Sequence, residues 1–135
     1  MKIPLDLDDG TPRAALDVAG QAVRAFNHRS ARRFDTCREG WQCPSDAYRA
    51  LGELTYLTGL LPQVFDHIAS SLRAQLDEGH IEIDYGTRYT GNAEAAIADA
   101  SAALEQATQD ARHLYRVLAA AQNAINAASY AGEPE

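Results

Sequence analysis

The sequence predicts an all-α protein: an elongated antiparallel helical hairpin preceded by a shorter helix, which together make a three- to four-helix bundle. Three observations predict this class. Apolar residues return at three- and four-residue steps in three separate stretches, which is the period of a helix. Alanine accounts for 26 of the 135 residues, and its methyl groups pack helices closely but bury little area each, so a thin core is expected. Residues typical of helix starts precede the first two stretches, at positions 11–12 and 44–46.

The first helix is expected over residues 12–29. The hydroxyl of Thr11 can accept a hydrogen bond from the first turn, and Pro12 suits the first helical position because an N–H there would have no partner. One apolar stripe follows, made of Leu16, Ala19, Val23 and Phe26. The C-terminal part carries cations, which the helix dipole favours at this end: Arg24, His28 and Arg29.

The second helix is expected over residues 46–77, kinked but continuous at Pro62. Positions 54, 61 and 68 stand seven residues apart and are all apolar, so the helical phase is the same on both sides of the proline. The connection before this helix, residues 30–44, is long. We expect Phe34 and Trp41 to anchor it to the bundle.

The third helix is expected over residues 92–129, as the second arm of the hairpin. Its apolar positions repeat every seven residues, as in a coiled-coil seam: Ile97, Leu104, Ala111, Leu118 and Ile125. Between the arms, residues 80–86 alternate apolar and polar like a strand without a partner, and an ordered loop is expected there. The whole chain, 1–135, is expected to be one domain with flexible tails at 1–10 and 130–135.

Composition and charge exclude several classes of protein. The chain carries 12 Lys+Arg against 19 Asp+Glu, a net charge of −7, which disfavours a general nucleic-acid binder or a protein of anionic membrane surfaces. The two cysteines, Cys37 and Cys43, have neither a zinc nor a redox spacing, so a reduced cytoplasmic setting is expected. The sequence has no signal-peptide stretch and no apolar run of membrane-spanning length. We therefore expect a soluble protein without a membrane partner.

One segment is locally basic, because residues 1–40 carry a net charge of +1 whereas residues 81–135 carry −5. Its cations are Arg24, His28, Arg29, Arg32, Arg33 and Arg38. The favoured interpretation is that these side chains balance the acidic third helix within the molecule. Two alternatives are a surface for an acidic protein partner and a nucleic-acid site, formed through Arg24, Arg29, Arg32 and Arg33.

We expect no catalytic, cofactor or metal site. Asp110 and His113 have the three-residue spacing of a di-iron ligand pair, but a di-iron bundle needs a second pair and two more carboxylates. His80, Glu82 and Asp84 would point outward from a half-buried extended segment. No nucleophile-elbow or phosphate-loop glycine pattern occurs. The expected function is therefore a non-enzymatic helical interaction or scaffold module without a cofactor.

Self-association is expected from the helix lengths. A helix over 92–129 would run about 57 Å, whereas the first helix would reach only about 27 Å and would shield one half of the hairpin, near the 30–44 connection. Apolar residues of the other half would stay partly in water: Phe65, Ile68, Leu72, Leu76, Ile97 and Leu104. We expect a two-fold homodimer that pairs these halves, besides an unidentified protein partner.

Three phrases resemble a group of small all-helical proteins of unknown function encoded in actinobacterial, especially streptomycete, genomes. They are Ala-Val-Arg-Ala-Phe-Asn-His at 22–28, Trp41 ahead of Pro-Ser-Asp-Ala-Tyr-Arg-Ala-Leu-Gly-Glu-Leu at 44–54, and Leu-Leu-Pro-Gln at 60–63. The resemblance covers about residues 12–129. It implies the helical fold and a bacterial cytoplasmic origin, and it carries over no catalytic residue.

A second resemblance is to small exported helical-hairpin proteins of the Trp-x-Gly type, whose motif lies in the hairpin turn. In this chain Trp41-Gln42-Cys43 lacks the glycine and precedes the hairpin. The tail lacks an acidic residue four places after Tyr130. This resemblance implies an exported helical hairpin as a further alternative.

Overall fold

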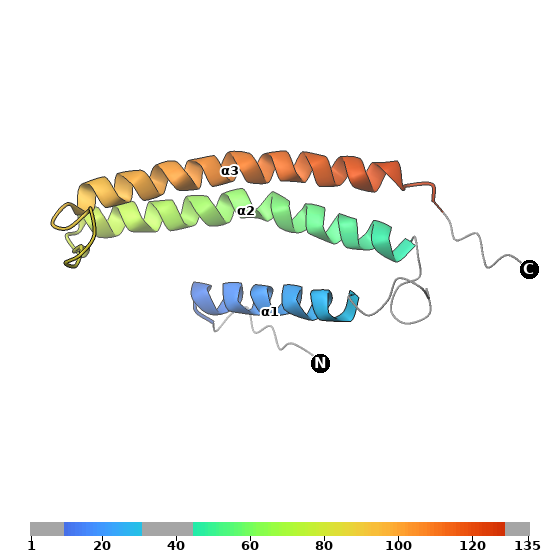
Figure 1. Ribbon diagram of the computed structural model, residues 1–135, viewed down its shortest axis with the longest axis horizontal. Helices are drawn as coiled ribbons and strands as arrows, with labels where there is room; N and C mark the ends of the chain where they lie inside the picture. Colours follow the sequence, from blue (N-terminus) through green and yellow to red (C-terminus); the bar gives the residue numbers. More distant parts are fainter. Residues whose placement is uncertain (1–9, 31–44, 129–135) are drawn as a thin grey trace, which may run out of the picture. The chain divides into compact units, whose positions relative to one another are not determined.

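A computed structural model describes residues 10–30 and 45–128 of the chain (Figure 1). This part contains three helices and no strand: α1 over Pro12–Ser30, α2 over Ser45–Asp77 and α3 over Ala93–Ala124. The all-α class is therefore confirmed. Helix α1 belongs to one compact unit, and residues 48–128 form another that holds α3 and nearly all of α2. The single domain over 1–135 stays a prediction, and both predicted tails lie outside the described residues apart from Gly10.

Helix α1 has nearly the predicted bounds, with its C-terminal end one residue later. The N–H of Ala14 donates to Thr11 Oγ1 over 3.2 Å, which is the predicted cap. His28 and Arg29 lie in the last turn, where they suit the helix dipole. Seven residues of the connection that the sequence analysis singled out lie outside the described part of the chain: Arg32, Arg33, Phe34, Cys37, Arg38, Trp41 and Cys43.

Helix α2 runs without a break through Pro62, as predicted, and Figure 1 shows its axis bending in the middle of the helix. Pro62 has no N–H to donate to the carbonyl of Thr58, so one hydrogen bond of the helix is missing there. The hydroxyls of Thr55 and Thr58 donate to the carbonyl oxygens of Leu51 and Thr55, over 2.7 and 2.9 Å. Both threonines are buried, and these bonds satisfy their hydroxyl protons within α2.

A glycine in the left-handed region ends α2. Gly79 has a φ of 77°, its N–H donates to Leu76 O over 3.0 Å, and the N–H of His80 donates to Gln75 O over 2.9 Å. This pair of bonds is the Schellman motif, which favours glycine because a Cβ would be strained at that φ. Residues 80–86 form no strand, so the predicted loop is confirmed.

The loop is tied to the start of α3. The hydroxyl of Tyr89 donates to Asp99 Oδ2 over 2.6 Å, and Arg88 forms an ion pair of 3.4 Å with the same carboxylate. The Arg88 guanidinium also lies over the Tyr89 ring, 4.7 Å from its centroid. Asn92 then caps α3, because its side-chain oxygen accepts from the N–H of Ala95 over 3.1 Å.

The predicted end of the third helix at residue 129 is wrong, because α3 ends at Ala124. The N–H of Ile125 bonds to Gln122 O, and that of Asn126 bonds to Asn123 O, each three residues back instead of four. This tighter winding is common at helix ends, and asparagine is a weak helix former. The seven-residue repeat continues to Ile125, so periodicity alone placed the end too late.

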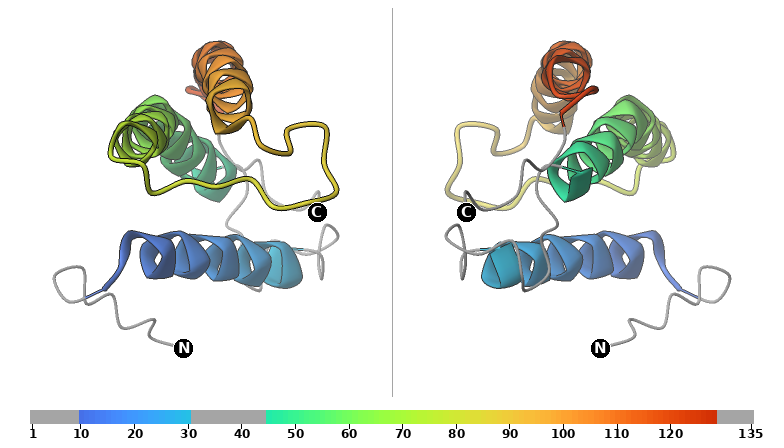
Figure 2. Two further views of the ribbon diagram at one scale, coloured as in Figure 1. Left: turned by 90° about the vertical axis from the view of Figure 1, so that its left-hand side faces the viewer. Right: turned by 90° about the vertical axis from the view of Figure 1, so that its right-hand side faces the viewer.

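Helices α2 and α3 lie side by side and antiparallel along most of their length (Figure 1, Figure 2), which confirms the predicted hairpin. The buried residues of the described part are few: Thr55, Thr58, Ile97 and Ala111. No large side chain among them is fully enclosed. The hairpin therefore buries only a thin core, as expected for a seam rich in alanine.

Candidate interaction surface

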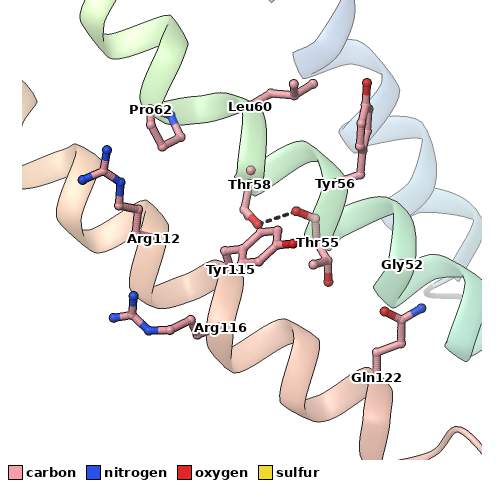
Figure 3. Close-up of a pocket in the computed structure, with 11 residues that line it drawn as sticks. Gly52, Thr55, Tyr56, Thr58, Leu60, Pro62, Arg112, Tyr115, Arg116 and Gln122 are labelled. Carbon is pink, nitrogen blue, oxygen red and sulfur yellow. Dashed lines mark hydrogen bonds between the residues drawn. The ribbon is translucent and has the colours of Figure 1, made fainter.

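Two grooves lie one after the other along the seam of the hairpin. The first has a volume of about 750 Å³ and is lined by α2 from Gly52 to Pro62 and by α3 from Arg112 to Gln122 (Figure 3). The second has a volume of about 620 Å³ and continues toward Ala69 and Ser101. Pro62 and Arg112 line both grooves. The two grooves therefore make one open surface, the grooved face.

Two glycines of α2 shape the first groove. A Cβ on Gly52 would lie 2.8 Å from Gln122 Nε2, and a Cβ on Gly59 would lie 3.2 Å from the ring of Tyr115. The bare backbone at both positions admits a side chain of α3. Gln122 uses this space to donate from Nε2 to Tyr48 O over 3.3 Å, a hydrogen bond that joins the two helices.

The floor of the first groove offers few polar groups to a ligand. The hydroxyls of Thr55 and Thr58 are buried and already donate within α2 (Figure 3). Tyr115 stays 44% exposed beside them. The first groove is thus mainly apolar with charged residues at its edges. Such a groove fits a side chain or a helix of a protein better than a small polar molecule.

The charged edges of the grooved face differ in sign along its length. Arg112 and Arg116 stand one helical turn apart at the first groove, and Asp66 and Glu105 edge the second. All four side chains are exposed. Within residues 10–30 and 45–128, no hydrogen bond or ion pair engages any of the four.

Ion pairs engage some other charges of the hairpin. Arg73 on α2 and Glu94 on α3 form a 3.0 Å ion pair next to the loop. The hydrogen bond to Glu94 raises the pKa of the Arg73 guanidinium above its usual value, and the hydrogen bond with Tyr89 does the same for the pKa of Arg88. Both pairs lie in water, where such contacts add little stability.

The flank opposite the grooves is aliphatic. On α2 its residues follow at three- and four-residue steps, about 160° around the helix from Gly52, Gly59 and Asp66. We call the following set the aliphatic face: Leu54, Leu57, Leu61, Val64 and Ile68 of α2, with Leu114 and Val117 of α3. Leu54, Leu57 and Ile68 are 38–39% exposed, and Leu114 and Val117 are 45% and 49% exposed.

The residues predicted for a dimer do not form one exposed surface. Ile97 is buried, and four of the others are half-buried: Phe65, Leu72, Leu76 and Leu104. Ile68 alone belongs to the aliphatic face. The predicted half holds part of the second groove, whereas most large exposed aliphatic side chains lie in the other half of the hairpin.

The predicted partner surface lies only in part within the described residues. Arg24, His28 and Arg29 are exposed on α1, whereas Arg32 and Arg33 lie outside the described ranges.

The sequence analysis did not predict the grooved face. Its signal was the pair Gly52 and Gly59, seven residues apart inside a helix, which is a spacing typical of close helix contact.

The candidate metal ligands considered above are spread out in the structure. Asp110 accepts a hydrogen bond from Gln106 over 3.0 Å, and His80 lies 3.4 Å from Glu78. Across the described ranges, no three His, Cys, Asp or Glu side chains group in a way that could hold a metal ion.

None of α1, α2 and α3 combines the length and apolar content needed to cross a membrane.

No family model, no curated protein and no solved structure matches this chain. The two resemblances drawn from the sequence therefore stay predictions.

Proposed function

We propose that the protein is a non-enzymatic helical interaction module that self-associates in the cytoplasm. The observation that carries this proposal is the thin core of the hairpin. Among the described apolar residues only Ile97 and Ala111 are buried, each 5% exposed. Leucines and tyrosines on both flanks keep much of their surface in water.

Covering that surface would be favourable. Burial stabilises by about 25 cal/mol per Å² of apolar area, so each half-exposed leucine would contribute about 1 kcal/mol on contact with a partner. Contiguous apolar patches on a protein surface mark interaction sites, and the exposed residues of the aliphatic face follow one another along the hairpin. A surface for an acidic protein on α1, centred on Arg24 and Arg29, is the alternative proposal.

Sedimentation equilibrium of the full chain, from about 1 to about 100 µM, tests self-association. We expect the mass of a dimer at the upper end and dissociation on dilution. The midpoint of thermal unfolding should also rise with protein concentration, because a partner that binds only the folded chain stabilises it. A monomer at every concentration, with a constant midpoint, would contradict the proposal.

A further inference from the structure

We infer that the grooved face binds a second copy of this chain, antiparallel and face to face, with Arg112 and Arg116 toward the acidic half of the other copy. The inference rests on the proposed self-association and goes beyond it by naming the face, the register and the residues that set them. It is carried by the order of charges along the hairpin.

The grooved face is self-complementary. Arg116 lies at one half and Glu105 and Asp66 at the other, with Arg112 where the two grooves meet, and none of them has a partner within the described residues. A two-fold dimer brings one surface patch against the same patch reversed. Reversal about the middle of this face therefore places each cationic half on an acidic half.

The register follows from positions on α3. Arg116 and Glu105 are about 16 Å apart along the helix axis, and the midpoint between them falls at Ala111. A two-fold axis across the face at that level places Arg116 of one copy at Glu105 of the second copy. The same axis puts Arg112 at the level of Asp66 of the second copy, which lies across the seam on α2. It crosses the place where both grooves meet, beside Pro62.

Apolar contacts supply the affinity of this pairing, and charges set its register. Exposed ion pairs contribute little by themselves, whereas the grooves hold half-exposed Tyr115 and Leu60 together with Phe65 and Leu104. A hairpin face of about 45 by 20 Å offers about 900 Å², close to what each partner of a standard interface buries. The area and the charges therefore fit the same occupant.

The aliphatic face fits a second copy less well. Asp110 lies one turn before Leu114 on that flank, and Glu53 borders Leu57 on α2. By helical position, Arg49 stands one turn before Glu53 and is the one arginine of α2 and α3 on this flank. A single cation does not give the aliphatic face two halves of opposite charge, so charge would set no register between two copies joined through it.

A charge-reversal pair tests the inference on the full chain. The acidic variant is Arg112→Glu/Arg116→Glu, and the basic variant is Asp66→Lys/Glu105→Lys. Each variant alone should dimerise about a hundredfold more weakly than the parent or worse, because positions 66, 105, 112 and 116 of both copies then carry charges of the same sign. An equimolar mixture should form a heterodimer at least as tight as the parent dimer, since every pair is then complementary.

Arg24→Glu/Arg49→Glu is the matched control, because it changes the net charge as the acidic variant does and lines neither groove. It should dimerise like the parent. Circular dichroism of every variant should show unchanged helicity, since the replaced side chains are exposed. The heterodimer gives a readout that misfolding cannot produce.

Three outcomes overturn the inference. If each variant dimerises as tightly as the parent, the interface lies elsewhere, and the proposed self-association still stands. If both variants lose the dimer and the mixture does not regain it, the two charge clusters do not face each other. A parent chain that is monomeric at about 100 µM overturns the inference and the proposed function together.

Discussion

The ring of Tyr115 on α3 lies against the bare backbone of Gly59 on α2, so closely that a methyl group on the glycine would stand 3.2 Å from the ring. Glycine in a helix interior is ordinarily unfavourable by about 1 kcal/mol relative to alanine. At this position the missing side chain gives an aromatic ring a place between the helices. The contact fixes how near α2 and α3 come at the middle of the first groove.

The coupling between these two residues can be measured. Gly59→Ala should change the free energy of unfolding by less than about 0.5 kcal/mol, because the gain in helix propensity is offset by displacement of the ring. In a Tyr115→Ala background the same substitution should stabilise by about 1 kcal/mol. Urea unfolding of the four proteins gives the coupling energy directly.

Gly20→Ala is the matched control for this cycle, since a Cβ there meets nothing within 4 Å. It should show no coupling to Tyr115→Ala. Equal effects of Gly59→Ala in both backgrounds would mean that the ring does not depend on the glycine.

The cap of α3 should matter for stability. Asn92→Ala removes the acceptor for the N–H of Ala95, and loss of such a cap destabilises by about 1 kcal/mol. Asn92→Asp keeps an acceptor and adds a charge that suits a helix N-terminus, so it should retain the parent stability. Chemical denaturation compares the three proteins. An alanine variant as stable as the parent would show that water replaces this bond without loss.

Removing the proline of α2 should stabilise the hairpin. Pro62→Ala restores an N–H that can donate to Thr58 O, and a proline in a helix interior costs about 3 kcal/mol. We expect a gain of about 2 kcal/mol, below the full value because the seam is built around the bent helix. A higher thermal midpoint would support this expectation. A destabilised variant would instead show that the bend is needed for packing against α3.

The basic residues of the first segment should not make the protein a nucleic-acid binder. The chain has a net charge of −7, and an acidic protein is repelled by phosphate backbones. Fluorescence anisotropy with duplex and single-stranded oligonucleotides should show no binding at about 10 µM protein and about 0.15 M salt. Salt-dependent binding that disappears in Arg24→Gln/Arg29→Gln/Arg32→Gln/Arg33→Gln would reverse this interpretation.

Much of the fold followed from local rules in the sequence. The heptad at positions 54, 61 and 68 predicted that α2 continues through Pro62, and the structure confirms it. Thr11 and Pro12 predicted the start of α1. These features depend on neighbours within one or two turns, which a single sequence displays. The predicted end of α3 was too late because the repeat of apolar residues does not show where the α-helical hydrogen bonds stop. The backbone changes to bonds three residues back at Ile125, where the apolar repeat still continues.

The candidate site depended on tertiary structure. Sequence periodicity determined which side of α2 and which side of α3 is apolar and faces the other helix, and composition determined that the core is thin. Only the packed hairpin decided that Gly59 receives Tyr115 and that Arg112 and Asp66 lie along the same pair of grooves. The physical reason is that the relative axial shift of two helices is set by contacts between residues far apart in the chain. A pattern on one helix carries no information on that shift.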